Sequence, residues 1–183
     1  MNIFATNIDP YVAGAEHLDK HVVKMPIEYS QLLATAHRVL DGIPSEFEHP
    51  RKGLIDYPYA LQEEQGSTPI LPLASHQNHP SAIWARECSA NYEWLYNLYL
   101  AVGAEYTYRY GREHASMRHA KRLQYFPENI RHSKEMTPFT MAMPDEYKCD
   151  DPIIAYRKYI SFGKRDDLHV WSHRETPFWF QNT

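Results

Sequence analysis

The residues best suited to chemistry lie in the stretch EHLDKHVVKMPIEYSQ, residues 16–31. Their spacing of three and four places polar side chains together on one face of a helix. A lysine beside a carboxylate on a partly buried face suits amine chemistry or acid–base catalysis. The candidate catalytic residues are therefore Lys24, Glu28, His17 and His21.

The same stretch has a simpler interpretation, an amphipathic helix with a solvated polar face. Lys20, Lys24, Glu28 and Gln31 form a polar stripe opposite an apolar one. A Lys24–Glu28 ion pair one turn apart would then be an ordinary surface feature. Spacing alone favours this interpretation. In the catalytic one, Lys20 and Gln31 help to line the pocket and contact the substrate.

The histidines allow a third interpretation, a metal site. His17 and His21 are spaced to share a metal ion, as are His76 and His79, and Glu28 could add an oxygen. The HExxH signature of zinc hydrolases is absent. A metal-dependent hydrolase that uses these pairs is kept as an alternative function, while the main expectation includes neither a metal nor a cofactor.

A locally basic strip lies within the second half of the chain, although the whole chain has a net charge of -4. Between residues 109 and 134, Lys and Arg outnumber Asp and Glu, and tyrosines lie among them. Such a strip suits phosphate contacts combined with base stacking. It is equally typical of a solvated helix face. The candidate phosphate contacts are Arg109, Arg112, Arg118 and Arg122.

The elements that must position these residues are mainly helical. Aspartate followed by proline at 9–10 and at 151–152 predicts helix starts, because Asp caps free N–H groups and Pro suits the first turn. We expect helices over 10–19, 20–40 with a kink or restart at Pro26, 80–110 closed by Gly111, 113–124 and 152–162. Residues 43–78 contain five prolines and are expected to be irregular.

Length and motifs limit the class of protein. The 183 residues suit one domain over 1–183, a mainly α helical bundle with a long central helix and extended loops. P-loop, GxGxxG and GxSxG signatures are absent. Two cysteines without a CxxC pattern fit a reducing compartment. Without a signal peptide or an apolar run long enough for a membrane, we expect a soluble intracellular protein with no membrane partner. The oligomeric state is left open.

The stretch AEHLDKHVVKMPIE resembles the first long helix of the pyrimidine-dimer DNA glycosylases of phages, the endonuclease V type. In that family a His-Leu pair is followed, eight residues after the His, by an apolar residue and a proline. Here these positions are His17-Leu18 and Met25-Pro26. The stretch NYEWLYNLYLAVGAEYTYRYGREH is similar to its central helix, and AYRKYISFGK, residues 155–164, to its aromatic and basic C-terminal stretch.

A second resemblance covers more of the chain. The segments DKHVVKM, HPSAIWARE, EYTYRYG, AMPDEYK and TPFWF together are similar to a group of uncharacterised proteins of phages and large DNA viruses. That resemblance implies an origin in a phage-infected host cell and a cytoplasmic location. It implies no activity.

The glycosylase resemblance implies an all-α fold and a site for DNA. In that family the N-terminal amine attacks the sugar, and a glutamate just before the apolar-Pro pair assists. Here that position is Lys24, and Asn2 follows Met1. Met1, Asn2, Tyr156 and Lys158 therefore join the expected substrate-binding residues.

The main hypothesis is a DNA glycosylase-like enzyme that acts on a pyrimidine base or its sugar, in DNA or in a nucleotide. Lys24, or the Met1 amine, would be the attacking amine, and Glu28 the general acid/base. The alternative is a non-catalytic protein on the same scaffold that binds nucleic acid, a nucleotide or a host factor.

Overall fold

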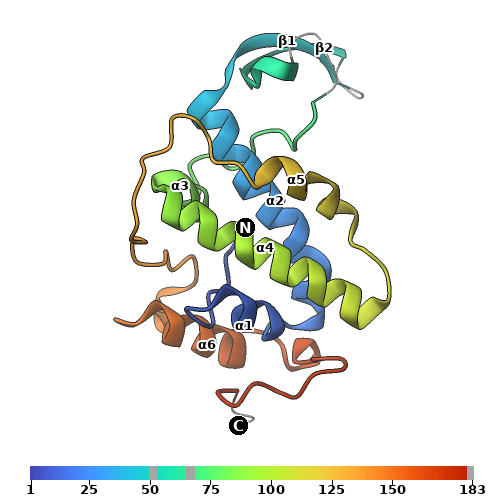
Figure 1. The fold of residues 1–183 in the computed structure, drawn as a ribbon. Helices are drawn as coiled ribbons and strands as arrows, with labels where there is room; N and C mark the ends of the chain where they lie inside the picture. The colour runs from blue at the N-terminus through green and yellow to red at the C-terminus, as the bar shows by residue number, and fades with distance from the viewer. Residues whose placement is uncertain (50–52, 65–68, 181–183) are drawn as a thin grey trace.

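Helices dominate the computed structural model, which describes residues 1–49, 53–64 and 69–180 (Figure 1). In this part of the chain, six α-helices are joined by four short 3-10 turns and a two-stranded hairpin, as the mainly α prediction requires. The helices are α1 (Pro10–Ala15), α2 (Asp19–Asp41), α3 (Pro80–Glu87), α4 (Ser89–Tyr110), α5 (Ala120–Leu123) and α6 (Pro152–Gly163). The strands are β1 (Ile43–His49) and β2 (Gly53–Ala60).

The predicted helix starts are confirmed at both Asp-Pro sites. The carboxylate of Asp9 accepts from the N–H of Tyr11, and that of Asp151 accepts from the N–H of Ile153. These bonds satisfy N–H groups that have no partner inside the helix. His79 caps α3 through its ring Nδ1, which accepts from the N–H of Ser81.

Helix α2 runs without interruption through Pro26, so the restart expected there does not occur. The ring of Pro26 is buried. The predicted apolar stripe faces the core, as helical spacing requires. Its members Val22, Met25, Tyr29, Leu32 and Ala36 are buried, and Leu40 is partly buried.

The helix predicted over 80–110 is divided in two. Cys88 has an extended backbone, with φ -157 and ψ 164, and separates α3 from α4. The side chain of Asn91 donates to the carbonyl of Trp84 at 2.9 Å across this break. Helix α4 is the central helix and packs against α1, α2 and α3. It ends at Gly111, whose φ of 68 is the left-handed conformation that glycine adopts without strain.

Residues 43–49 and 53–60 correct the expectation of an irregular segment. They form the two strands of an antiparallel hairpin that projects at the end of the molecule opposite α6 (Figure 1). The register shifts between Ile43 and Ser45, where Pro44 lies. Proline is tolerated in a strand at such an irregularity, because its missing N–H breaks no ladder bond there. The five prolines therefore did not justify the prediction that the whole of this segment is irregular.

A buried arginine joins the hairpin to the helices. The guanidinium of Arg38, which is 0% exposed, donates to the carbonyls of Tyr59, Leu71 and Pro72. These carbonyls belong to β2 and to the chain beyond it.

The helix predicted over 113–124 is a 3-10 turn over Ala115–His119 followed by α5.

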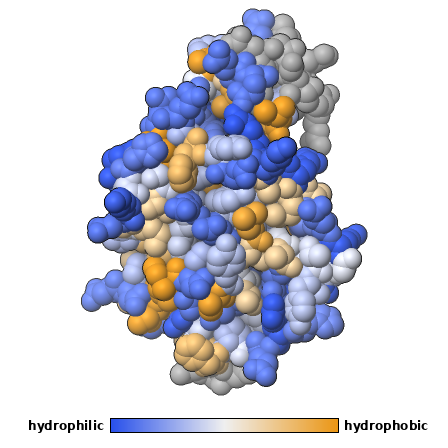
Figure 2. All heavy atoms as spheres, viewed as in Figure 1, coloured by the Kyte–Doolittle hydropathy of each residue, from blue (hydrophilic) through white to orange (hydrophobic). Residues whose placement is uncertain are grey.

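The face seen in Figure 2 is mostly hydrophilic, with small hydrophobic patches scattered over it. Single apolar side chains on a surface are normal. No helix among the described residues is long and apolar enough to cross a membrane.

The contact between α1 and α4 is close enough to test by substitution. A Cβ on Gly14 would lie 2.7 Å from the Cβ of Ala101, which is nearer than two carbons can approach. Gly14→Ala is expected to lower the free energy of unfolding by about 1–3 kcal/mol, because α1 must move outward. Urea unfolding measures this. Val12→Ala, on the exposed side of α1, should change stability by less than about 0.5 kcal/mol, and an equal loss in both variants would contradict the close packing.

Candidate functional site

A cavity of about 300 Å³ lies between the first residues of the chain, α2 and the end of α6. We call it the α2 pocket. Five of the expected site residues line it: Met1, Asn2, His21, Lys24 and Glu28. The other lining residues are Phe4, Met25, Ala142, Tyr159 and Lys164.

Lys24 and Glu28 form the ion pair that their spacing predicted. The Nζ of Lys24 lies 2.9 Å from Oε1 of Glu28. The lysine side chain is 71% exposed, whereas the glutamate side chain is only 13% exposed. Glu28 therefore belongs to the wall of the α2 pocket, and Lys24 reaches it from the rim.

His21 forms an apolar part of the wall together with Phe4. The two rings stack, with centroids 4.0 Å apart and an interplanar angle of 22°. Burial lowers the pKa of His21 well below its ordinary value, and the positive charges of Lys164 and Lys24 act in the same direction. The ring is therefore neutral at pH 7. Its Nδ1 is buried and has no hydrogen-bond partner among the residues that the structure describes.

Lys164 is a pocket residue that sequence reasoning missed. Its ammonium lies 4.3 Å from the ring centroid of Tyr159 and 5.2 Å from that of Phe4. It also donates to the Tyr159 hydroxyl at 3.1 Å. Lys164 is the last residue of the stretch AYRKYISFGK, so the signal was present. Only the fold shows that Lys164 and Tyr159 face the pocket.

A buried network fixes the first residues against the pocket. The Asn2 side chain accepts from the Tyr156 hydroxyl at 2.7 Å and donates to the carbonyl of Ala142 at 2.9 Å. Phe4 has a φ of 46, which is strained for a residue with a Cβ. Tyr156 is 0% exposed. This tyrosine, expected at the substrate, therefore positions Asn2 from inside the core.

His17 also acts from the core. Its Nδ1 lies 2.7 Å from the carbonyl of Ala13, and its Nε2 lies 2.7 Å from the Tyr29 hydroxyl. That hydroxyl is also 2.7 Å from the carbonyl of Ile3, so it has one proton to share between two acceptors. Burial lowers the pKa of His17 to about 4. The neutral ring is a positioning group behind the pocket wall.

The histidine pairs do not converge as metal ligands. Both ring nitrogens of His17 already have protein partners, so His17 could bind a metal only by breaking them. The Nδ1 of His79 caps α3, and the Nδ1 of His76 lies 2.6 Å from the Ser75 hydroxyl. The residues that the structure describes contain no group of three or more His, Cys, Asp or Glu that could hold a metal ion.

Arg109 is a structural residue rather than a phosphate contact. Its side chain is 0% exposed, and its guanidinium binds the carboxylates of Glu105 and Asp19, each at 2.7 Å. It also donates to the carbonyls of His17 and Ala15. Glu105 lies one helical turn before Arg109, but the other partners come from far along the chain.

The remaining expected residues lie outside the α2 pocket. Arg112 and Arg118 are exposed, and Arg122 is ion-paired with Glu63. Lys20 is exposed and Gln31 is half-buried. Neither is among the residues that line the pocket.

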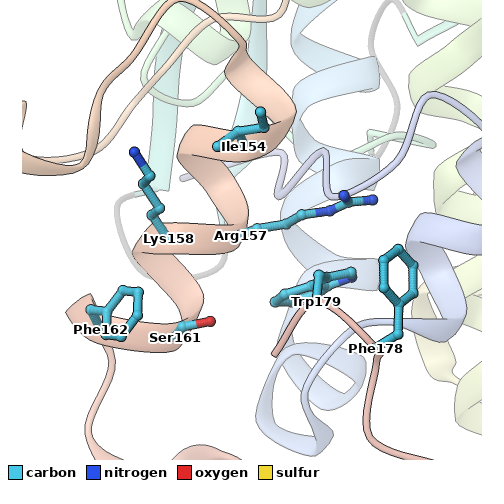
Figure 3. Close-up of a pocket in the computed structure, with 7 residues that line it drawn as sticks. All are labelled: Ile154, Arg157, Lys158, Ser161, Phe162, Phe178 and Trp179. Atoms are coloured by element: carbon cyan, nitrogen blue, oxygen red, sulfur yellow. The ribbon is translucent and has the colours of Figure 1, made fainter. Parts of the chain in front are cut away.

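Lys158 lies at a second pocket, of about 440 Å³, on another side of α6 (Figure 3). Here Arg157 points towards the rings of Phe178 and Trp179, with its guanidinium carbon 5.6 and 5.7 Å from their centroids. Lys158 points away from these rings. Lys158 is not among the residues that line the α2 pocket.

The chemistry open to the α2 pocket is that of an amine beside a carboxylate. An amine can attack an electrophilic carbon, and a carboxylate one helical turn away can accept or donate the proton. Neutral His21 and the Lys164 ammonium can orient a polar, anionic ligand.

No protein-family model matches the chain, and neither does a curated protein or a solved structure.

Proposed function

We propose that the chain is a DNA glycosylase-like enzyme that acts on a pyrimidine base or its sugar, in DNA or in a nucleotide. The observation that carries the proposal is the meeting of Met1, Asn2, His21, Lys24 and Glu28 around one cavity. Helical spacing accounts for three of them, whereas residues 1–2 reach the cavity only through the fold. The resemblance to the phage glycosylases concerns three of them: Met1 and Asn2 at the N-terminal amine, and Lys24 at the position where that family has its glutamate.

The ion pair supplies both groups that the reaction needs. Moving one proton across the 2.9 Å contact turns the ammonium of Lys24 and the carboxylate of Glu28 into an amine and a carboxylic acid. The amine nitrogen forms a bond to C1′ of the sugar as the bond from C1′ to the base breaks. The base leaves with the electron pair and takes the proton from Glu28. The Glu28 carboxylate then takes a proton from the new C1′–N ammonium and passes it to O4′ as the C1′–O4′ bond breaks. The nitrogen lone pair forms the C1′=N bond, which gives a protonated Schiff base.

The surroundings would hold the sugar and its phosphates. His21 and Asn2 present ring and amide edges to the pocket, and Arg112, Arg118 and Arg122 are the candidate phosphate contacts in DNA. A base inside a duplex would have to be flipped out of the stack to reach the cavity. An enzyme of this kind would work in the cytoplasm of a phage-infected cell.

The alternative is a non-catalytic protein that binds nucleic acid, a nucleotide or a host factor. One observation favours it: the side chain of Lys24 is 71% exposed, so water solvates the ammonium in the free protein. A bound substrate would have to remove that water before the amine could react. Such desolvation on binding is common in closed active sites.

Borohydride trapping tests the proposal. With an oligonucleotide that contains one abasic site, sodium borohydride should reduce the Schiff base to a stable covalent adduct, visible as a shifted band on a denaturing gel. Lys24→Ala should lower the yield at least tenfold, because it removes the attacking amine. Glu28→Gln should slow adduct formation by about 10²–10⁴-fold, because it removes the general acid/base.

The matched control is Lys134→Ala, which removes an exposed lysine outside the α2 pocket. It should leave the yield unchanged. If Lys24→Ala and Lys134→Ala both trap as well as the unchanged protein, Lys24 is not the amine. The absence of any adduct, together with the absence of base release from pyrimidine-dimer DNA, would reject the proposed function and leave the binding protein.

A further inference from the structure

The α2 pocket carries a positive charge that no carboxylate neutralises. Lys24 is paired with Glu28, the one carboxylate among the lining residues. Lys164 has only the Tyr159 hydroxyl and the two aromatic faces as partners within the described part of the chain, and it forms no ion pair there. An ammonium held above aromatic rings without a counter-ion is a binding point for an anion.

The same pocket contains a second group that lacks a partner among the described residues, the imidazole of His21. His21 is 8% exposed, lines the same pocket and has a buried Nδ1 without a partner. Lys164 and Lys24 line the same cavity as His21. A buried polar atom without a hydrogen bond is uncommon in native proteins and calls for an explanation. Because Nδ1 is shielded from the cavity in the free protein, the imidazole would turn on binding to bring it to a hydrogen-bonding group of the ligand.

Size and surface charge favour a small ligand over a duplex. A cavity of about 300 Å³ is at the lower end of the range for small-molecule sites. Duplex DNA needs several cationic contacts on its phosphates. In this structure Arg109 is buried, Arg122 is paired with Glu63, and the chain has a net charge of -4. The basic strip is therefore weaker than its sequence suggested.

We propose that the ligand of the α2 pocket is a single nucleotide with a terminal phosphate, whose phosphomonoester is bound by Lys164 and whose sugar faces Lys24 and Glu28. This inference deepens the proposed function and rests on it for the nucleoside part. The phosphate part rests on Lys164 and His21. A phosphomonoester carries nearly two negative charges at pH 7, more than the single charge of an internal phosphodiester.

Calorimetric titration with deoxythymidine 5′-monophosphate tests the inference, with thymidine and inorganic phosphate as separate probes. The monophosphate should bind at least tenfold more tightly than thymidine, and more weakly as salt is added. Inorganic phosphate should compete with it. Lys164→Gln should weaken binding of the monophosphate about tenfold and leave thymidine unaffected. Lys164→Arg, which keeps the charge, should retain most of the affinity.

The matched control Lys134→Gln removes an exposed lysine outside the pocket and should bind like the unchanged protein. Circular dichroism checks that each variant is folded. Equal binding of thymidine and its monophosphate overturns the inference, as does unchanged binding in folded Lys164→Gln. Tighter binding of an oligonucleotide without a terminal phosphate also overturns it, because the site would then serve a polymer.

The two proposals fail in different ways. Binding of the monophosphate that depends on Lys164, without a trapped adduct or base release, rejects the proposed function and keeps this inference. An adduct on the abasic oligonucleotide, without measurable binding of the monophosphate, keeps the proposed function and overturns this inference.

Discussion

Arg109→Met will lower the free energy of unfolding by about 3–5 kcal/mol, which is a large part of the stability of a domain of this size. The guanidinium is fully buried between the carboxylates of Glu105 and Asp19. Methionine fills similar space but removes the guanidinium from both carboxylates, so Glu105 keeps only Arg174 as a cation within the described part of the chain and Asp19 keeps only its bonds from Ser172. Removing one member of a buried charged group leaves an uncompensated charge, and that residual charge is the larger part of the loss.

Urea unfolding followed by circular dichroism measures this effect. Arg109→Lys should recover only part of the loss, because an ammonium cannot reproduce the two-sided contacts of a guanidinium. Arg112→Met is the matched control, since Arg112 is exposed and donates only to the Tyr106 hydroxyl within the described part of the chain. It should change stability by less than about 0.5 kcal/mol. A loss below about 1 kcal/mol for Arg109→Met would show that the network contributes little.

Acidification from pH 7 to pH 4 will destabilise the protein by several kcal/mol. Burial lowers the pKa of His17 and of His37 to about 4 in the folded protein. In the unfolded chain both pKa values are about 6.5. The unfolded state therefore binds more protons between these values. Stability is fully present above about pH 6.5 and is lost as the pH falls towards 4.

The size of the effect follows from the difference in pKa. Each histidine contributes on the order of 3 kcal/mol at pH 7, because one pKa unit corresponds to about 1.4 kcal/mol. The neutral ring of His21 acts in the same direction. Below about pH 4 the carboxylates of Asp19 and Glu105 add a further loss, since hydrogen bonds lower the pKa of each.

Urea midpoints at pH 7.0, 5.5 and 4.5 will measure the acid sensitivity. His37→Phe should flatten the profile, although it loses the hydrogen bond with the Tyr92 hydroxyl at every pH. His132→Gln, which changes an exposed histidine, should leave the profile unchanged. A flat profile in the unchanged protein would mean that buried histidines do not control stability between pH 4 and 7.

Local signals predicted the parts of the fold that neighbouring residues determine. Asp9 and Asp151 cap helices because the next residues supply free N–H groups, and Lys24 meets Glu28 because one turn separates them. The break at Cys88 could not be predicted in this way. It depends on the Asn91 side chain and on a distant carbonyl, that of Arg131, which accepts from the N–H of Ser89.

The candidate site was predictable on one side only. The α2 face of the pocket follows from helical spacing, so Lys24 and Glu28 were identified from the sequence. The opposite side comes from Phe4 and from Tyr159 and Lys164, which lie far from Phe4 in the chain and meet it only through long-range packing. Arg109 shows the reverse error, because a cation among tyrosines gives no sign that the fold will bury it.

The last described segment has a consequence for folding during synthesis. The Asp19 side chain binds the Ser172 N–H and hydroxyl, 153 residues further along the chain, and the Asn2 side chain binds Tyr156, 154 residues further along. Contacts of this separation slow folding. At about 5–20 residues per second, the ribosome needs on the order of ten seconds to supply the later partners. The start of α2 and the floor of the α2 pocket can therefore be completed only after Tyr156 and Ser172 have been synthesised.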